Sequence, residues 1–140
     1  MDALIGHQTR DHDDLDLVIP LPAADAARRT LTALGFRPTE DEATLCFVAR
    51  DARDRRVDVH IVTFDDEGGA LQRQEDGSLW RYPPEGFLGL GQVDGREVAC
   101  LSAEVQVLCH LNYDPDETDH RDMKLLAESR SMVLPAPYGS

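Results

Sequence analysis

Hydrophobic and polar residues alternate most regularly near the middle of the chain. In RVDVHIVTF at 56–64, valine and isoleucine side chains alternate with Asp58 and His60. Because successive side chains of a strand point to opposite faces, this pattern predicts a strand with one apolar and one polar face. Shorter apolar runs, one ended by proline and one followed by the polar turn DARDR, predict further strands at 15–20 and 44–50.

Helix formers and their boundary residues predict helical segments elsewhere. The run AADAARRTLTAL is rich in helix formers and is followed by Gly35, while Ser102 is placed to cap a later helix. The predicted helices cover residues 1–8, 23–34, 103–111 and 117–131. Glycine and proline pairs predict a loop-rich region at 65–88, and Asp94-Gly95 predicts a hairpin at 92–101. This order of elements predicts an α+β fold with a mixed or antiparallel sheet flanked by helices.

Length and charge narrow the range of partners. The 140 residues suit a single domain over 1–140, and they carry 14 Lys and Arg against 27 Asp and Glu, a formal net charge of −13. Phosphate backbones are bound through basic residues, so no nucleic-acid partner is expected, and an anionic membrane surface is disfavoured for the same reason. No apolar stretch approaches the roughly 18 residues of a membrane-spanning helix, and we expect no secretory leader.

The cysteines argue against a disulfide framework. Cys46, Cys100 and Cys109 are odd in number, form no CxxC pair and lie in apolar runs. Free thiols in such runs are usually buried, and this usage is typical of a reducing compartment. We therefore expect three buried free thiols, no zinc site and a cytoplasmic protein.

Acidic residues gather at the start of the first predicted strand. Asp14 and Asp16 are two positions apart, so in an extended backbone both carboxylates project from one face. Neighbouring carboxylates repel each other unless a cation neutralises them, and oxygen ligands suit Mg²⁺. Asp58 could complete a triad that holds two Mg²⁺ ions around a triphosphate and takes the proton of an attacking hydroxyl. The same spacing also occurs in solvated turns, so the residues alone leave both interpretations open.

Three segments carry a resemblance to a known family. They read GHQTRDHDDLDLVI at 6–19, RRVDVHIV at 55–62 and CLSAEVQVLCHLNYDPDETDHRDMKLL at 100–126. In this order they resemble the antibiotic nucleotidyltransferases of the lincosamide and aminoglycoside 2″-adenylyltransferase type. The pattern H-x-x-Y followed by D-x-x-D-[MI]-K-x-L is most similar to the lincosamide branch. The resemblance implies a nucleotidyltransferase-like mixed sheet flanked by helices.

The resemblance also implies roles for single residues. Asp14 and Asp16 match the two metal-binding aspartates of the family, and Asp58 matches the third, which helps to bind metal and acts as general base on the antibiotic hydroxyl. Such enzymes use Mg²⁺, here expected as two ions, and transfer a nucleoside monophosphate from a nucleoside triphosphate, with ATP the first candidate. Arg10 and His12 lie in the matching R-x-H-x-D-[IL]-D segment and are candidate nucleotide ligands.

Other candidates admit both a functional and a structural interpretation. His60 is either a pocket group or a hydrogen-bonded structural histidine, and the structural role is favoured. Residues of the last segment either line the nucleotide or drug pocket or form a polar network that locks the C-terminal helices: His110, Tyr113, Asp119, Asp122 and Lys124. The aromatic residues of LWRYPPEGF, namely Trp80, Tyr82 and Phe87, are either a ligand wall or a loop anchor.

The sequence departs from the family at its beginning. Family members start with a helix and a strand that ends in Gly-Gly-Trp, which lets the backbone approach the triphosphate. This sequence opens at MDALIGHQTR, directly after that element, so we expect a fold truncated at its N-terminus. Three explanations stay open: a misassigned start, a shortened relative that binds without transferring, and a partner chain or homodimer mate that supplies the strand.

The leading hypothesis is Mg²⁺-dependent transfer of a nucleoside monophosphate to a hydroxyl of a small molecule, a lincosamide or an aminoglycoside antibiotic. The alternative is a non-catalytic, truncated family member that acts as a binding or interaction protein. A third hypothesis, the nucleotidyltransferase of a toxin–antitoxin pair acting on tRNA, is disfavoured by the acidic composition.

Overall fold

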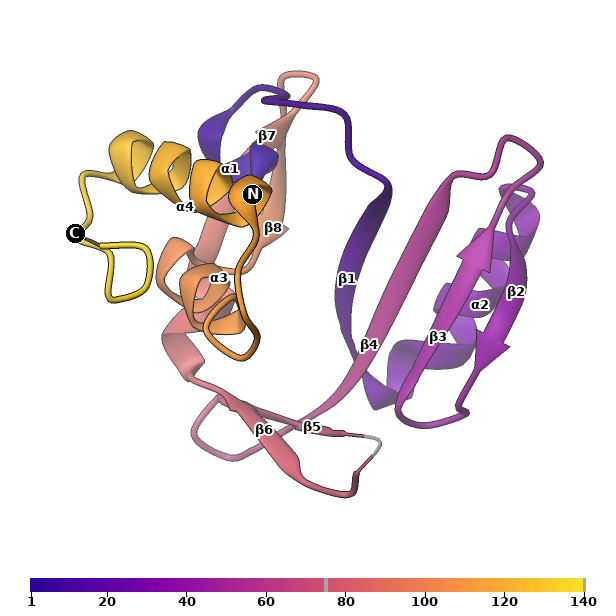
Figure 1. Ribbon diagram of the computed structural model, residues 1–140. Helices are drawn as coiled ribbons and strands as arrows, with labels where there is room; N and C mark the ends of the chain where they lie inside the picture. The colour runs from indigo at the N-terminus through magenta and orange to yellow at the C-terminus, as the bar shows by residue number, and fades with distance from the viewer. Residues whose placement is uncertain (75, 140) are drawn as a thin grey trace. The chain divides into compact units, whose positions relative to one another are not determined.

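The computed structural model describes residues 1–74 and 76–139 and divides into two compact units (Figure 1). One unit comprises Asp11–Tyr82, and the other comprises Met1–Arg10 together with the chain from Pro83 onward. Within the described residues, the helices are all too short or too polar to cross a membrane.

The unit Asp11–Tyr82 is built on a mixed sheet. Its strands are β1 (Asp14–Pro20), β2 (Arg37–Asp41), β3 (Cys46–Arg50), β4 (Arg56–Phe64), β5 (Ala70–Arg73) and β6 (Leu79–Tyr82), and its helices are the 3-10 turn Leu21–Ala23 and α2 (Ala24–Ala33). The strands follow the order β2-β3-β4-β5-β6 with antiparallel pairing, and β1 pairs with β4 in parallel. The expected α+β fold with a mixed sheet is therefore confirmed.

Helix α2 covers one face of this sheet (Figure 1). The alternation along β4 directs Val57, Val59 and Ile61 into the core that α2 closes, where they pack with Ala24 and Phe47. These side chains are at most 5% exposed. Their burial supplies the hydrophobic stabilisation of the unit and leaves the intervening positions of β4 on the opposite face.

The second unit combines a hairpin with three helices. Its elements are α1 (Asp2–Ile5), the 3-10 turn Pro84–Leu88, β7 (Gly89–Val93), β8 (Arg96–Cys100), α3 (Ala103–Cys109) and α4 (Glu117–Arg130). Leu4 of α1 packs with Val107 of α3 and with Met123 and Leu126 of α4. Gly91 must be small, because a Cβ atom there would collide with the backbone of Ala3. The short first helix is thereby fixed against the hairpin.

Most of the sequence expectations for single elements hold. The strands at 15–20, 44–50 and 56–64 and the helices at 23–34, 103–111 and 117–131 correspond to β1, β3, β4, α2, α3 and α4 within a few residues. The hairpin turns at Asp94-Gly95, where both residues have positive φ, and Ser102 accepts a hydrogen bond from Val105 N as the α3 cap.

Three expectations were wrong. The region 65–88 contains β5, β6 and a 3-10 turn rather than being mainly loop, and strand β2 was not foreseen. The first helix ends at Ile5, not at residue 8, because Gly6 adopts a left-handed conformation there. The three cysteines are free as expected, but all are half-buried rather than buried.

Candidate functional site

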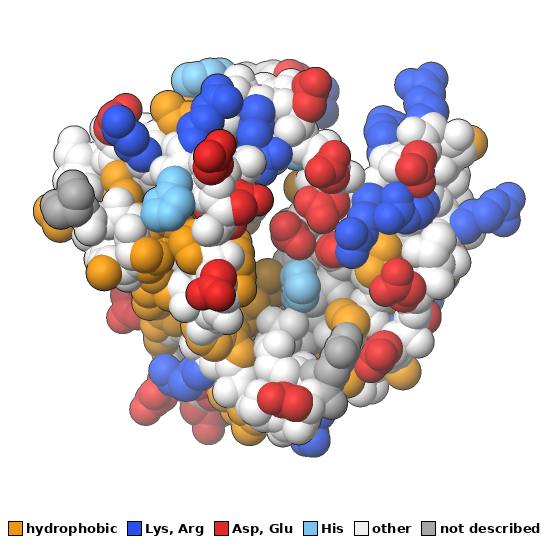
Figure 2. All heavy atoms as spheres, in the orientation of Figure 1, with side chains coloured by type: hydrophobic (Ala, Val, Ile, Leu, Met, Phe, Trp, Pro, Cys, Tyr) orange, Lys and Arg blue, Asp and Glu red, His pale blue; other side chains and the backbone are white. Residues whose placement is uncertain are grey.

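The parallel pairing of β1 with β4 brings the predicted aspartates together. Asp16 lies opposite Asp58 in the strand register, and Asp14 lies opposite Arg56. Because parallel neighbours in register point to the same side, these side chains and His60 share the sheet face that α2 leaves uncovered. Figure 2 shows acidic side chains gathered beside a histidine on this part of β1 and β4. We call the side chains of Asp14, Asp16, Arg56, Asp58 and His60 the acidic face.

Arg56 pairs closely with one of the three carboxylates of the acidic face and approaches a second. Its Nε donates to Asp58 Oδ1 at 2.7 Å and its Nη2 donates to Asp58 Oδ2 at 2.6 Å, while Nη1 lies 3.9 Å from Asp14 Oδ2. A two-pronged guanidinium–carboxylate pair is both short and directional. Arg56 was not among the predicted site residues, although its position two residues before Asp58 on one strand was a usable signal.

The pKa values of Asp14 and Asp16 shift in opposite directions. Partial burial, followed by the negative charges of Asp16 and Asp58, raises the pKa of Asp14 above its ordinary value, and Arg56 only partly offsets them. The hydrogen bond with His60 lowers the pKa of Asp16, with burial acting in the opposite direction. Asp14 thus registers the repulsion within the acidic face.

Carboxylate oxygens crowded in this way fit a hard divalent cation such as Mg²⁺, which would relieve their repulsion. Among the residues described, however, no three His, Cys, Asp or Glu side chains are arranged to hold one ion together. Both Asp58 oxygens are held by Arg56 instead. A cation that bound Asp58 together with Asp14 and Asp16 would therefore compete with the guanidinium.

His60 is hydrogen-bonded on both ring nitrogens. Its Nε2 lies 3.3 Å from Asp16 Oδ1, and its Nδ1 lies 3.1 Å from Nε2 of Gln72 on β5. The expected structural role for His60 agrees with these contacts, which also link it to a candidate metal ligand. Gln72 was not among the predicted site residues. It lies twelve positions from His60, and no local pattern in the sequence indicates their contact.

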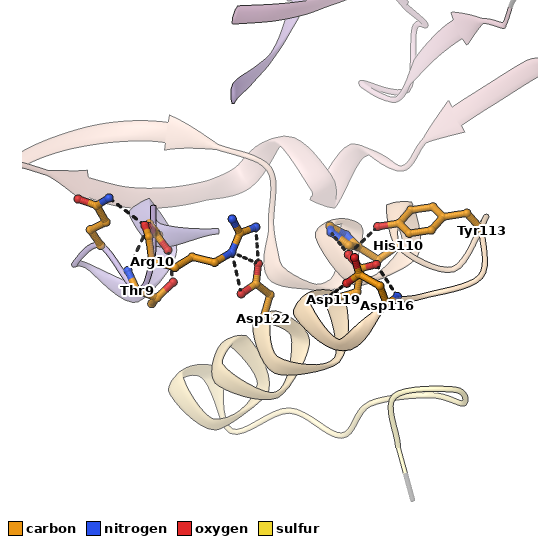
Figure 3. A network of polar contacts seen from close by, with 9 residues as sticks. Thr9, Arg10, His110, Tyr113, Asp116, Asp119 and Asp122 are labelled. Carbon is orange, nitrogen blue, oxygen red and sulfur yellow. Dashed lines mark hydrogen bonds and ion pairs between the residues drawn. The ribbon is translucent and has the colours of Figure 1, made fainter. Parts of the chain in front are cut away.

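Arg10, a candidate nucleotide ligand, belongs to the other unit and binds Asp122 on α4 there (Figure 3). Its Nε lies 3.0 Å and its Nη2 2.9 Å from Asp122 Oδ2. Asp122 is only 6% exposed, so the pair anchors the segment after α1 to α4. His12, the second candidate, is exposed in the unit Asp11–Tyr82.

Three of the remaining candidates, His110, Tyr113 and Asp119, meet at the start of α4 (Figure 3). Asp116 and Asp119 form a reciprocal capping box, in which each side chain accepts the backbone N–H of the other residue. Tyr113 donates its hydroxyl hydrogen to Asp119 Oδ1 at 2.9 Å, and His110 Nε2 lies 3.9 Å from the same oxygen. Lys124 is exposed on α4. These contacts agree with a helix-locking network for His110, Tyr113 and Asp119.

The aromatic residues of LWRYPPEGF fall into different units. Trp80 is half-buried and makes an edge-to-face contact with Tyr82, with ring centroids 6.2 Å apart, and Tyr82 is only 5% exposed. Phe87 is half-buried in the unit that continues from Pro83. Tyr82 thus lies in the interior of its unit, where its hydroxyl donates to Gln72 Oε1 at 2.7 Å.

Two comparisons with known proteins match most of the chain. A family model described as aminoglycoside-2″-adenylyltransferase matches residues 1–126. A lincosamide resistance protein of Staphylococcus haemolyticus is 27% identical over 126 residues, which cover 90% of this chain and 78% of that protein.

Solved structures give the same result. The lincosamide antibiotic adenylyltransferase LnuA, bound to lincomycin, has a TM-score of 0.78 and 26% identity over 91% of this chain and 80% of its own. ANT(2″)-Ia in complex with adenylyl-2″-tobramycin has a TM-score of 0.70 and 25% identity over 92% of this chain and 74% of its own. The fold of the chain is thus that of these nucleotidyltransferases.

Proposed function

Because the chain belongs to the aminoglycoside-2″-adenylyltransferase family, we propose that it transfers a nucleoside monophosphate from a nucleoside triphosphate to a hydroxyl of an antibiotic-like small molecule. The observation that carries the proposal is the register of β1 and β4, which sets Asp16 opposite Asp58 on the acidic face. The relatives named above act on, or bind, a lincosamide or an aminoglycoside, and these two classes are our candidates for the acceptor.

In the proposed reaction the acceptor hydroxyl oxygen forms a bond to the α-phosphorus of the triphosphate. The bond from that phosphorus to the bridging oxygen of the β-phosphate breaks, and pyrophosphate leaves. The hydroxyl proton passes to the carboxylate of Asp58, whose side chain is 17% exposed and so partly shielded from water. Mg²⁺, held by Asp14, Asp16 and Asp58, would neutralise the phosphates and polarise the phosphorus.

Charge and sequence motif favour different acceptors. A net charge of −13 favours a cationic acceptor, as an aminoglycoside is, whereas the last sequence motif points to lincosamides. Nucleoside triphosphates and Mg²⁺ are both available in the cytoplasm, where we place the protein, and ATP is our first candidate for the nucleotide.

We further propose that the chain acts as one nucleotidyltransferase-like domain, since the family match runs through both of its units.

A non-catalytic binding protein on the same fold is the second candidate function. The hold of Arg56 on both oxygens of Asp58 favours it, since this contact engages the carboxylate that the transfer reaction needs as its base. The two functions differ in one respect: a binding protein retains Mg²⁺-dependent nucleotide binding but forms no nucleotidylated acceptor.

The experiment combines calorimetry with product analysis. MgATP and MgGTP are titrated into the chain and into an Asp14→Asn/Asp16→Asn control, and then lincomycin and tobramycin are offered with the nucleotide that binds. We expect saturable binding that the control loses, pyrophosphate release, and an acceptor whose mass increases by one nucleoside monophosphate. Binding without product supports the second function, and a folded chain without binding overturns both. Asp58→Asn should bind nucleotide but transfer none.

A further inference from the structure

A chain of side-chain hydrogen bonds runs from the interior of the unit Asp11–Tyr82 to the acidic face. Tyr82 on β6 donates its hydroxyl hydrogen to Gln72 Oε1 at 2.7 Å, Gln72 Nε2 lies 3.1 Å from His60 Nδ1, and His60 Nε2 lies 3.3 Å from Asp16 Oδ1. Four strands, β6, β5, β4 and β1, contribute one residue each. The inner two residues are well shielded, with Gln72 8% and Tyr82 5% exposed.

The residues at both ends of this series of hydrogen bonds require the same assignment of donors and acceptors. An ionised carboxylate only accepts, so Nε2 of His60 must carry the hydrogen that points at Asp16. At the other end, the Tyr82 hydroxyl donates to the amide oxygen of Gln72, so the amide NH₂ of Gln72 is the group that donates to His60 Nδ1. His60 is thereby fixed as the tautomer with hydrogen on Nε2 and with a lone pair on Nδ1 that accepts from Gln72.

Burial of a glutamine side chain costs hydration free energy that an apolar side chain would not lose. Polar side chains in the interior need partners to offset their lost hydration, and an apolar residue of the same size needs none. Gln72 and Tyr82 satisfy each other, yet the second bond of Gln72 goes to a half-exposed histidine that contacts a candidate metal ligand. This points to orientation of the acidic face rather than to filling alone.

We infer that Gln72 and Tyr82 are positioning residues of the transfer site, which act through His60 to fix the orientation of the Asp16 carboxylate. The inference rests on the proposed function, because orientation of Asp16 matters only where this carboxylate binds a cation. Partners that orient a metal ligand from the outside typically change metal affinity or activity about 10–100-fold when they are removed.

Two variants test the inference. Gln72→Met keeps the size of the side chain and removes both amide groups, and we expect it to weaken Mn²⁺ binding, used as the probe for Mg²⁺, by roughly tenfold. Tyr82→Phe keeps the ring and removes only the hydroxyl, so it should have a smaller effect in the same direction. Gln92→Met makes the same replacement at an exposed position of β7 and serves as the matched control.

A spectroscopic measurement separates orientation from general damage. In the full chain with ¹⁵N-labelled histidine, long-range ¹H–¹⁵N correlation shows which ring nitrogen carries hydrogen, and the His60 signals are assigned by their loss in His60→Gln. We expect the Nε2–H tautomer in the wild type and a mixture of tautomers in Gln72→Met. Far-ultraviolet circular dichroism verifies that each variant is folded.

The outcomes separate this inference from the proposed function. An Nδ1–H tautomer in the wild type overturns the inference, and so does a Gln72→Met chain whose tautomer and Mn²⁺ affinity match the wild type. A wild-type chain that binds no Mn²⁺ overturns the metal role in the proposed function and this inference with it. If Gln72→Met fails to fold, Tyr82→Phe decides by the same two measurements.

Discussion

The guanidinium of Arg56 holds both carboxylate oxygens of Asp58, at 2.7 and 2.6 Å. Both residues lie on one face of β4, and Arg56 also approaches Asp14 on the neighbouring strand. The acidic face therefore already contains a cation that belongs to the protein. A divalent ion that binds Asp58 competes with this guanidinium, and the strength of the arginine pair becomes a cost of metal binding.

Removal of Arg56 should accordingly tighten metal binding. The pair is partly exposed, with side-chain exposure of 32% for Arg56 and 17% for Asp58, so solvent screening keeps its strength modest. We expect Arg56→Met to raise Mn²⁺ affinity about fivefold, as measured by titration with paramagnetic resonance detection. Arg50→Met is the control, because Arg50, on the adjacent strand β3, pairs with the exposed Asp54 instead. An affinity that falls in Arg56→Met would show that Arg56 assists binding instead.

Replacement of Asp14 should raise stability while it removes activity. The raised pKa of Asp14 means that the folded protein holds this proton more tightly than the unfolded chain does. The free energy of unfolding therefore falls as pH rises through the raised pKa, and at neutral pH the ionised side chain destabilises the fold.

Asp14→Asn removes this penalty, which is below about 1 kcal/mol for a side chain that is one-third exposed. Urea unfolding without divalent cations should show the gain, with Asp25→Asn on the exposed side of α2 as control. Nucleotidyl transfer should fall by roughly 100-fold or more in the same variant. A variant that is both less stable and fully active contradicts the crowding of charges at this face.

The Arg10–Asp122 pair should stabilise the unit that contains α4. Asp122 is buried and accepts hydrogen bonds from Nε and Nη2 of Arg10, so its replacement weakens a charge-assisted pair. We expect Asp122→Asn to lower the free energy of unfolding by about 2 kcal/mol, the usual value for hydrogen bonds to a charged group. Glu128→Gln, at an exposed position of the same helix, should change it by less than about 0.5 kcal/mol.

The affinity of Arg10→Met and Asp122→Asn for nucleotide distinguishes a structural role of Arg10 from a role in nucleotide binding. If Arg10 only anchors α4, then Arg10→Met lowers stability and leaves the dissociation constant of MgATP unchanged. If it is a triphosphate ligand, as its sequence motif suggests, the affinity for MgATP falls in Arg10→Met and is retained in Asp122→Asn.

The sequence was most informative where one strand has two different faces. Val57, Val59 and Ile61 must pack against α2, and this requirement alone places Asp58 and His60 on the opposite side. Strand β2 gave no such signal, because all residues of Arg37–Asp41 are exposed and the strand is held by its pairing with β3. In β5 the buried polar Gln72 breaks the hydrophobic alternation, so the strand resembled a loop.

Contacts between residues far apart in the sequence could not be predicted either. Asp122 and Arg10 are 112 positions apart, and no local pattern pairs them. The capping box at Asp116 and Asp119 was readable in principle, since two acids three positions apart often begin a helix. Its significance for Tyr113 and His110 depends on how the preceding turn folds back, which spacing does not specify.

Tyr113 supplies a test at alkaline pH of whether the cluster before α4 is structural. Partial burial of the phenol, followed by its hydrogen bond to Asp119, raises the pKa of Tyr113 above its ordinary value. The folded protein therefore retains the phenolic proton over a range in which the unfolded chain has lost it. The contribution of this group to stability is complete below the unfolded pKa of about 10 and is lost as pH rises through the raised folded pKa.

Tyr113→Phe should consequently flatten the dependence of the free energy of unfolding on pH above about 10. Ultraviolet absorbance of the phenolate in Asp119→Asn should show that Tyr113 ionises at lower pH than in the wild type, because the negatively charged acceptor has been removed. Nucleotidyl transfer by Tyr113→Phe should remain near the wild-type rate if Tyr113 only locks the helices. A large rise in the KM of the acceptor, with the pH dependence of stability unchanged, would instead assign Tyr113 to the drug pocket.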